Sequence, residues 1–318
     1  MKGTLLSGLM YKLFALVFSV YCSFSGGVVP PSTEAPITPS GNGAKLVFAA
    51  IADPQVSNYM PDRFVYFKEA SQDLRAAKGL DAMLIAGDIA ENGMTDEYNM
   101  FIDELGGLNL RYIGCVGNHD IRLKPYCVSS KRFNSFMNTL NGDEDATSLH
   151  HSEFINGIKF IVMGSDRTEF EESYISDEQL SWLDSELASQ NGELTFVLIH
   201  QPLKLTHGLP DVWNSPIDSA GSVGKQSDEL RAILGKYKNV VFLTGHEHTG
   251  FGQYSYEKID GFDSINIPSL CCNNADGDYN EHGLGYIVEV YENSVLFRAR
   301  DMCKGIWLEE YDIELTIG

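Results

Sequence analysis

The chain has 318 residues and carries 44 acidic against 23 basic side chains, which gives a formal net charge of −21. This balance argues against nucleic acid or an anionic membrane surface as a partner, because phosphate groups are bound by basic patches. Hydrophobic residues make up 43% of the chain and charged residues 21%, which is ordinary for a globular protein and wrong for a disordered one. We therefore expect a folded protein that does not bind a nucleic-acid polymer.

The first 25 residues have the layout of a secretory signal peptide. Lys2 and Lys12 flank a weakly polar start, an apolar run covers 13–20, and small residues stand at 23 and 25. A charged front, a short apolar middle and a small-residue end mark such signals. We expect cleavage, a secreted or cell-surface protein and no stable membrane insertion. The alternative is an uncleaved N-terminal anchor, although polar residues interrupt the run too often for a good spanning helix.

The remainder divides into a linker and a single domain. Residues 26–44 are rich in Pro, Gly, Ser and Thr, which predicts an extended linker. Residues 45–318 contain neither an internal repeat nor a second linker, so we expect them to form one domain. Five cysteines follow the signal without a Cys-x-x-Cys pair, so a structural zinc site of that kind is not expected, while one or two disulfides remain open.

Hydrophobic patterning predicts the elements in chain order. Continuous apolar runs predict buried strands at 45–52, 81–86, 110–116, 194–199 and 240–243. Helical spacing, with a Ser-x-x-Gln capping box at 176–179, predicts helices at 63–78, 95–105, 134–140, 176–189 and 227–234. An Asn-Gly turn predicts a hairpin over 154–163, and alternation predicts strands at 253–259, 265–267, 286–291, 295–300 and 306–315. This order predicts an α/β protein with two central sheets flanked by helices.

Polar residues follow five of the apolar strands at the point where each strand ends. These segments are Asp53-Pro54-Gln55, Gly87-Asp88, Gly117-Asn118-His119-Asp120, His200 and Gly245-His246-Glu247-His248. In α/β sheets, ligands bind outside the carboxyl ends of the strands, where such loops converge. Carboxylate, amide and imidazole groups without thiolates are the mix expected for Zn²⁺, Mn²⁺ or Fe. Each segment alone is a weak signal, but five in order predict a metal site.

The five segments resemble the motifs of the calcineurin-like metallophosphoesterase superfamily, whose pattern is D-x-H, GD, GNH(D/E), H and GHxH. The resemblance covers roughly Lys45 to the C-terminus, and four of the five motifs match. It implies a four-layer α/β/β/α sandwich of two central mixed sheets flanked by helices. It also implies two divalent metal ions (Mn, Zn or Fe) and a phosphoester substrate, a mono- or diester that is hydrolysed by a metal-bound hydroxide.

The resemblance also implies a role for each matching residue. One metal would be held by Asp53, Gln55, Asp88 and His248. The other would share the Asp88 carboxylate and be held by Asn118, His200 and His246. His119 would protonate the leaving oxygen, oriented by a carboxylate such as Asp120.

One position departs from the pattern, because Gln55 stands where the superfamily usually has His. An amide oxygen is a poorer ligand than imidazole for borderline metals, so the first metal is expected to be weaker, different, or replaced by a hydrogen bond to water. The D-P-Q variant is similar to a branch that contains a protein phosphatase, but it does not assign a substrate. A catalytically weak, metal-containing binding protein of the same fold is the alternative to an enzyme. The choice between monoester and diester, and the oligomeric state, stay open.

Overall fold

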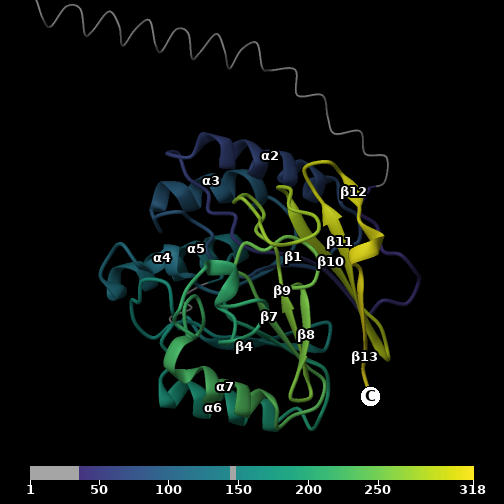
Figure 1. Ribbon diagram of the computed structural model, residues 1–318. Coiled ribbons are helices and arrows are strands. Elements are labelled where there is room, and N and C mark those ends of the chain that lie inside the picture. Colours follow the sequence, from purple (N-terminus) through teal and green to yellow (C-terminus); the bar gives the residue numbers. More distant parts are fainter. Residues whose placement is uncertain (1–35, 144–147) are drawn as a thin grey trace, which may run out of the picture. The chain divides into compact units, whose positions relative to one another are not determined.

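The computed structural model describes residues 36–143 and 148–318 (Figure 1). The predicted signal peptide at 1–25 and the first part of the predicted linker lie outside these residues. Among the helices of the described ranges, none combines the length and the apolar character needed to cross a bilayer.

The first sheet has its strands in the spatial order β12–β11–β10–β1–β2–β3, with β13 paired to β11. Strands β1, β2 and β3 run parallel, with β3 at the edge, and β10 joins β1 in the antiparallel direction. All residues of β1, β2 and β10 are buried, which explains their continuous apolar runs. The strands are β1 (Leu46–Ile51), β2 (Ala82–Ile85), β3 (Arg111–Gly114), β10 (Leu284–Val290), β11 (Ser294–Asp301), β12 (Ile306–Trp307) and β13 (Ile313–Thr316).

The second sheet has the spatial order β4–β5–β6–β7–β9–β8. Strands β5, β6, β7 and β9 run parallel. At one edge β4 pairs with β5, and at the other β8 pairs with β9, both in the antiparallel direction. Both sheets are therefore mixed. The strands are β4 (His151–Ile155), β5 (Ile158–Val162), β6 (Thr195–Leu198), β7 (Val240–Thr244), β8 (Tyr256–Ile259) and β9 (Phe262–Asn266).

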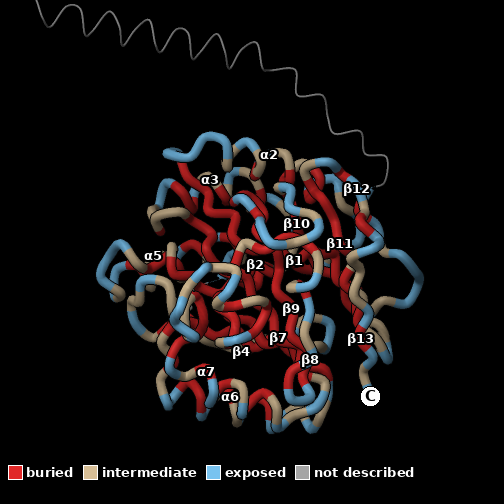
Figure 2. Tube along the Cα trace, viewed as in Figure 1, coloured by how far each residue is buried: buried red, intermediate tan, exposed pale blue. Residues whose placement is uncertain are grey.

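Three buried apolar clusters hold the layers together. One fills the space between the two sheets, with Phe48 of β1 packed edge-on against Phe160 and Phe196. A second lies between the first sheet and α2, α3 and α5, and a third lies between the second sheet and α6 and α7 (Figures 1 and 2). The predicted α/β/β/α sandwich is thus confirmed. The helices are α2 (Pro61–Ala76), α3 (Thr95–Leu105), α4 (Asn118–Ile121), α5 (Tyr126–Asn141), α6 (Asp177–Ala188) and α7 (Ser227–Leu234).

Helix α5 is the element that differs most from its prediction. It begins at Tyr126, eight residues before the predicted segment 134–140, and ends at Asn141. Its buried residues are Ser129, Phe133, Phe136 and Leu140, so the buried apolar side chains begin only at Phe133. Because periodicity detects a helix by its apolar stripe, the turns before Phe133 give no helical signal in the sequence.

The end of the predicted linker packs against the first sheet. Ile37 is only 1% exposed and belongs to the cluster beneath α2, and the Ser40 backbone N–H donates to the Glu289 carboxylate at 2.9 Å. Within 36–44, these contacts replace the extended linker expected from composition. The five cysteines of the described residues are all free, so the disulfides that the sequence left open are not formed there.

Candidate metal centre

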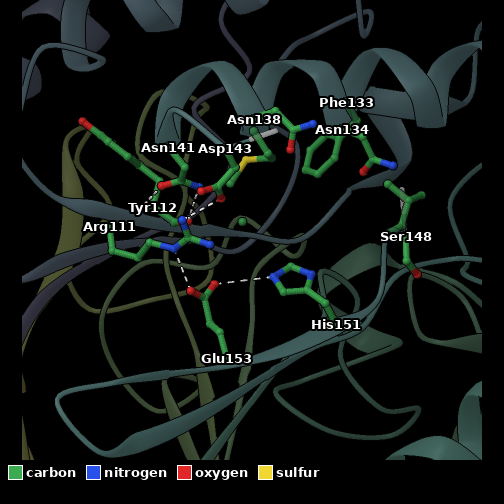
Figure 3. A pocket seen from close by; sticks show the side chains of 13 residues that line it. Arg111, Tyr112, Phe133, Asn134, Asn138, Asn141, Asp143, Ser148, His151 and Glu153 are labelled. Atoms are coloured by element: carbon green, nitrogen blue, oxygen red, sulfur yellow. Dashed lines mark hydrogen bonds and ion pairs between the residues drawn. The ribbon is translucent and has the colours of Figure 1, made fainter. Parts of the chain in front are cut away.

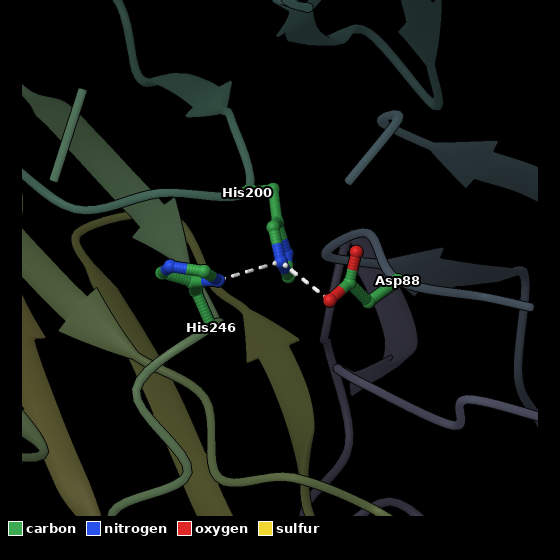
Figure 4. A group of neighbouring side chains, drawn as sticks. All are labelled: Asp88, His200 and His246. Carbon is green, nitrogen blue, oxygen red and sulfur yellow. Dashed lines mark hydrogen bonds and ion pairs between the residues drawn. The ribbon is translucent and has the colours of Figure 1, made fainter. Parts of the chain in front are cut away.

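The carboxyl ends of β1, β2, β6 and β7 bring most of the predicted metal ligands together. His200, which follows β6, lies at the middle of the group: its Nε2 is 3.2 Å from Asp88 Oδ2 and 3.1 Å from His246 Nδ1 (Figure 4). Atoms of Asp88, His200 and His246 all lie within 4.8 Å of one another, close enough to share one ion. All three side chains are buried.

Asp53 and His248 form the other half of the group. Asp53 Oδ1 lies 3.1 Å from His248 Nε2 and 3.7 Å from His200 Nε2, so the Asp53 carboxylate joins the two halves. Its second oxygen accepts the backbone N–H of His246 at 2.9 Å. The His248 side chain is 28% exposed, which places this half of the centre at the surface side.

The Asn118 amide has partners outside the set of predicted ligands. Its amide Nδ2 donates to the Phe170 carbonyl at 3.1 Å and to the Glu171 carboxylate at 2.9 Å, and its Oδ1 lies 3.5 Å from Gln201 Nε2. In the described part of the chain, no hydrogen bond joins Asn118 directly to another predicted ligand. Glu171 and Gln201 are therefore neighbours of the centre that no motif indicated.

Glycines in the motifs allow the ligands to approach one another. A Cβ at Gly117 would meet the Asp88 carboxylate oxygen at 2.0 Å, and a Cβ at Gly87 would meet the His200 ring at 2.5 Å. Gly87 also has φ = +84°, which other residues adopt only with strain. These contacts give a steric reason for glycine at both positions.

The backbone of the centre is strained at several predicted ligands. Asp53, Gln55, Asp88, His246 and His248 have φ values of +49°, +38°, +47°, +77° and +53°. Non-glycine residues in this region cost on the order of 1–3 kcal/mol each and concentrate at functional sites. The strain aims five side chains at one place, which an unstrained turn would not do.

The side chains of the buried half shift one another's pKa values. Burial alone would lower the pKa of His200, but the Asp88 and Asp53 carboxylates outweigh it and raise this pKa to about 10. Burial lowers the pKa of His246 well below its ordinary value, and the neighbouring His200 lowers it further. For Asp88, burial would raise the pKa, but the His200 charge holds it well below its usual range. A cation among these carboxylates is thus favourable.

The donor set also fits a metal ion. His246 Nε2 is buried and has no hydrogen-bond partner among the described residues, although a neutral or charged imidazole nitrogen normally has one. Carboxylate oxygens and imidazole nitrogens at this spacing suit Zn²⁺, Mn²⁺ or Fe. Asp88, His200 and His246 would hold one ion, and Asp53 and His248 would hold a second, with Asp88 shared by both as the resemblance implies.

The predicted proton donor His119 lies at the edge of the group. Its Nε2 is 3.9 Å from Asp88 Oδ2, and its Nδ1 lies 2.8 Å from the Glu91 carbonyl oxygen and 3.5 Å from a Glu91 carboxylate oxygen. A carbonyl oxygen only accepts, so this contact requires a proton on Nδ1 and turns Nε2 towards Asp88. Arg122 Nη2 lies 3.0 Å from the same Nδ1, farther than the Glu91 carbonyl oxygen, and competes with that oxygen for contact with the nitrogen.

Among the described residues, the hydrogen bonds of the Asp120 carboxylate go to groups other than the His119 ring. Its carboxylate accepts the backbone N–H groups of Gly117 at 2.9 Å and Ala90 at 3.1 Å, and the Tyr98 hydroxyl at 3.0 Å. It therefore ties the loop after β2 to the turn after β3. Burial and the nearby Asp88 charge raise the pKa of Asp120 to about 7. The His119 ring instead has Glu91 and Arg122 at its Nδ1.

Comparison with known proteins agrees with this centre. A family model described as calcineurin-like phosphoesterase matches residues 46–250, which include every predicted ligand. The chain belongs to this family. Its members are metal-dependent, which accords with the cluster of Asp88, His200 and His246.

Relatives of this chain in the family are named as phosphodiesterases. The chain is 28% identical over 176 residues to a probable cyclic nucleotide phosphodiesterase of Fibrobacter succinogenes, covering 54% of this chain and 59% of that protein. It is 27% identical over 172 residues to a probable glycerophosphodiester phosphodiesterase of Arcobacter nitrofigilis, covering 53% and 56%. The matched region therefore spans less than two thirds of these relatives.

A solved structure shares the fold. A dimetal phosphatase from Danio rerio superposes with a TM-score of 0.62 at 14% identity, covering 86% of this chain and 100% of that one. At this level of identity the likeness concerns the fold alone.

Gln55, the departure from the family pattern, is held by Asp88 and by two residues that no motif indicated. Its Nε2 donates to Asp88 Oδ2 at 3.1 Å. Its Oε1 accepts from Arg63 Nη1 at 3.0 Å and from the Cys272 thiol. The amide oxygen, which would be the metal ligand, is thus occupied by two donors. Cys272 lies 217 positions away in the sequence, so local patterns could not reveal this contact.

Proposed function

We propose that this chain is a metal-dependent phosphodiesterase with two divalent ions at the centre formed by the strand ends. The observation that carries the proposal is the buried cluster of Asp88, His200 and His246 in a chain of the phosphoesterase family. The names of the relatives support a diester over a monoester. The substrate, the number of ions and the hydroxide mechanism are parts of this proposal.

The chemistry follows from what each group can do. Divalent ions, when bound, would polarise the phosphoryl oxygens and make water a stronger nucleophile at neutral pH. Asp53 and Asp88 supply negative charge that offsets the charge of the ions. His119 gives a proton to the departing alcohol from Nε2, while the Glu91 carbonyl holds the opposite nitrogen.

The proposal is tested with metal-free protein reconstituted with Mn²⁺, Zn²⁺ or Fe²⁺ and assayed against a panel of phosphate mono- and diesters. We expect hydrolysis of diesters that depends on added metal and is lost in Asp88→Asn. Asp184→Asn is the matched control, since Asp184 pairs with Lys236 at the surface, away from the centre. Stoichiometric metal without turnover of any ester would contradict the proposal and favour the alternative, a metal-containing binding protein.

We also propose that the protein is secreted or attached to the cell surface. The support is the signal-like segment 1–25, which lies outside the described residues. Expression of the full chain, followed by N-terminal sequencing of the extracellular fraction, tests this. A mature N-terminus near residue 26 is expected, whereas an intact Met1 on cytosolic protein would contradict it.

A further inference from the structure

The segment between β5 and α6 places the Glu171 carboxylate beside the centre. One of its oxygens accepts from the Asn118 amide Nδ2 at 2.9 Å, and the other accepts from Arg122 Nη1 at 3.1 Å. Glu172, the next residue, accepts from the Ser219 hydroxyl instead, at 2.9 Å. Within the described structure, Glu171 is therefore the member of this adjacent pair that reaches a predicted metal ligand.

Two acceptors hold the Asn118 amide in one orientation. Its Nδ2 carries two hydrogens, which go to the Glu171 carboxylate and to the Phe170 carbonyl oxygen at 3.1 Å. An ionised carboxylate and a carbonyl oxygen only accept, so turning the amide over would bring its oxygen against two other oxygens. The amide nitrogen is therefore fully used. The amide oxygen has only a distant contact, 3.5 Å from Gln201 Nε2, and keeps lone pairs for another partner.

This orientation matters because an amide binds a metal ion through its oxygen. Atoms of Asp88, His200 and His246 lie close enough to share an ion, and these residues supply three ligands (Figure 4). A fourth ligand completes the coordination that Zn²⁺ usually takes in proteins. The Asn118 oxygen can fill this place only if the amide nitrogen is kept on the other side. Residues that orient ligands in this way strongly affect metal affinity.

Contacts on several sides hold Glu171 itself in position. Arg122 pairs with its carboxylate, and the same guanidinium lies 5.2 Å from the centroid of the Phe170 ring. Gln201 Nε2 donates to the Glu171 backbone carbonyl at 3.0 Å. Arg122 follows α4 and Gln201 follows β6, so both supports belong to loops that carry predicted ligands. The carboxylate is therefore fixed relative to the ligands, as a positioning role requires.

We propose that Glu171 is a positioning residue for the ion held by Asp88, His200 and His246. Together with the adjacent backbone carbonyl it takes both N–H groups of the Asn118 amide and so presents the amide oxygen to that ion. The inference rests on the metal centre of the proposed function and adds to it a residue outside the five motifs.

Two other glutamates provide matched controls. Glu172→Gln removes the same charge one position away, without touching the Asn118 amide. Glu153 also pairs with an arginine, Arg111, at 2.6 Å, and lines a separate cavity of about 230 Å³ between β3, α5 and β4 (Figure 3). Arg111 begins β3, whereas Asn118 lies beyond the opposite end of that strand. Glu153→Gln therefore breaks a comparable pair away from the centre.

The test measures metal binding directly. The full chain is stripped of metal and titrated with Mn²⁺, and the affinity for each ion is obtained from the electron paramagnetic resonance signal of free Mn²⁺. Glu171→Gln should weaken one of these affinities about 10- to 100-fold, the range typical when a residue that orients a ligand is replaced. Glu172→Gln and Glu153→Gln should bind like the wild-type protein. Thermal unfolding of the metal-free proteins checks that each variant is folded.

A donor–acceptor swap separates orientation from charge. Asn118→Asp removes the amide N–H groups, so two carboxylates would face each other, and Glu171→Gln in this background restores a donor. The same substitution should therefore strengthen Mn²⁺ binding there, although it weakens binding in the wild-type background. Loss of negative charge alone, or a structural defect, would weaken binding in both backgrounds. That result would overturn the positioning role.

The outcomes also separate this inference from the proposed function. If the wild-type protein binds Mn²⁺ and hydrolyses diesters while Glu171→Gln keeps both affinities, the positioning role is wrong and the phosphodiesterase function stands. If the swap reverses the sign but Mn²⁺-loaded wild-type protein hydrolyses no ester, the positioning role stands and the proposed function fails. Wild-type protein that binds no ion would overturn both.

Discussion

The two halves of the candidate metal centre differ in how the chain encloses them. In the buried half, His200 and His246 follow two neighbouring parallel strands, meet Asp88, and are 0% and 5% exposed. In the open half, His248 is 28% exposed in its side chain and borders a cavity. The buried half is therefore shaped by the strand ends and the closely approaching glycines. In the open half, Asp53 follows β1 and is buried, whereas His248 lies four residues beyond β7 and is partly exposed.

The two halves also differ in whether their ligand atoms are already hydrogen-bonded, as Gln55 shows. In the buried half, Asp88, His200 and His246 offer ligand atoms that all lie within 4.8 Å of one another. In the open half, the Gln55 oxygen already accepts from Arg63 and Cys272. An ion there must displace those donors or bind without the amide. We therefore expect the buried half to bind metal first and more tightly.

The largest expected effect comes from the residue that both halves share. Asp88→Asn removes one negative charge between two cations, so both ions should be lost. Because metal ions contribute several kcal/mol of transition-state stabilisation, activity should fall at least about 10³-fold. Elemental analysis and turnover check this together, with Asp184→Asn as the control. Undiminished metal with full activity would contradict a shared carboxylate.

His119→Ala tests the catalytic edge of the centre while leaving both halves intact. General acid catalysis contributes about 10²–10⁴-fold when the departing oxygen is basic. Hydrolysis of alkyl esters should fall by that factor, and hydrolysis of p-nitrophenyl esters much less, because nitrophenolate departs without a proton. Metal content should stay at the wild-type level. An equal loss on both ester classes would contradict proton donation, and loss of metal would make His119 a ligand.

Gln55→His should reduce the difference in metal affinity between the two halves. In the wild-type protein, a chelator should remove one ion well before the other. Imidazole binds borderline metals better than an amide oxygen, so the variant should slow the release of the weaker ion, by about tenfold if it gains about 1.4 kcal/mol of binding energy. Metal content is followed during timed exposure to the chelator. Equal release of both ions from the wild-type protein would show that Gln55 is not the weak point.

Sequence patterns predicted the architecture and the clustering of the ligands for the same reason. Buried parallel strands are continuous apolar runs, and their carboxyl ends meet at one edge, so Asp53, Asp88, His200 and His246 had to converge. Such patterns do not say which side chain faces which. The partners of Asp120 and of Asn118 depend on loop conformations, and Gln55 meets Cys272 across 217 positions. These contacts come from the folded structure and not from any local signal.

The claim that the buried half binds metal before the open half is tested most directly by locating the first ion to bind. Crystals of metal-free protein would be soaked with one equivalent of Mn²⁺, and anomalous diffraction would give the position of the ion. We predict a single strong peak within bonding distance of Asp88, His200 and His246, with a second peak beside Asp53 and His248 only at higher concentration. A first peak beside Asp53, Gln55 and His248, or two equal peaks at one equivalent, would contradict the account.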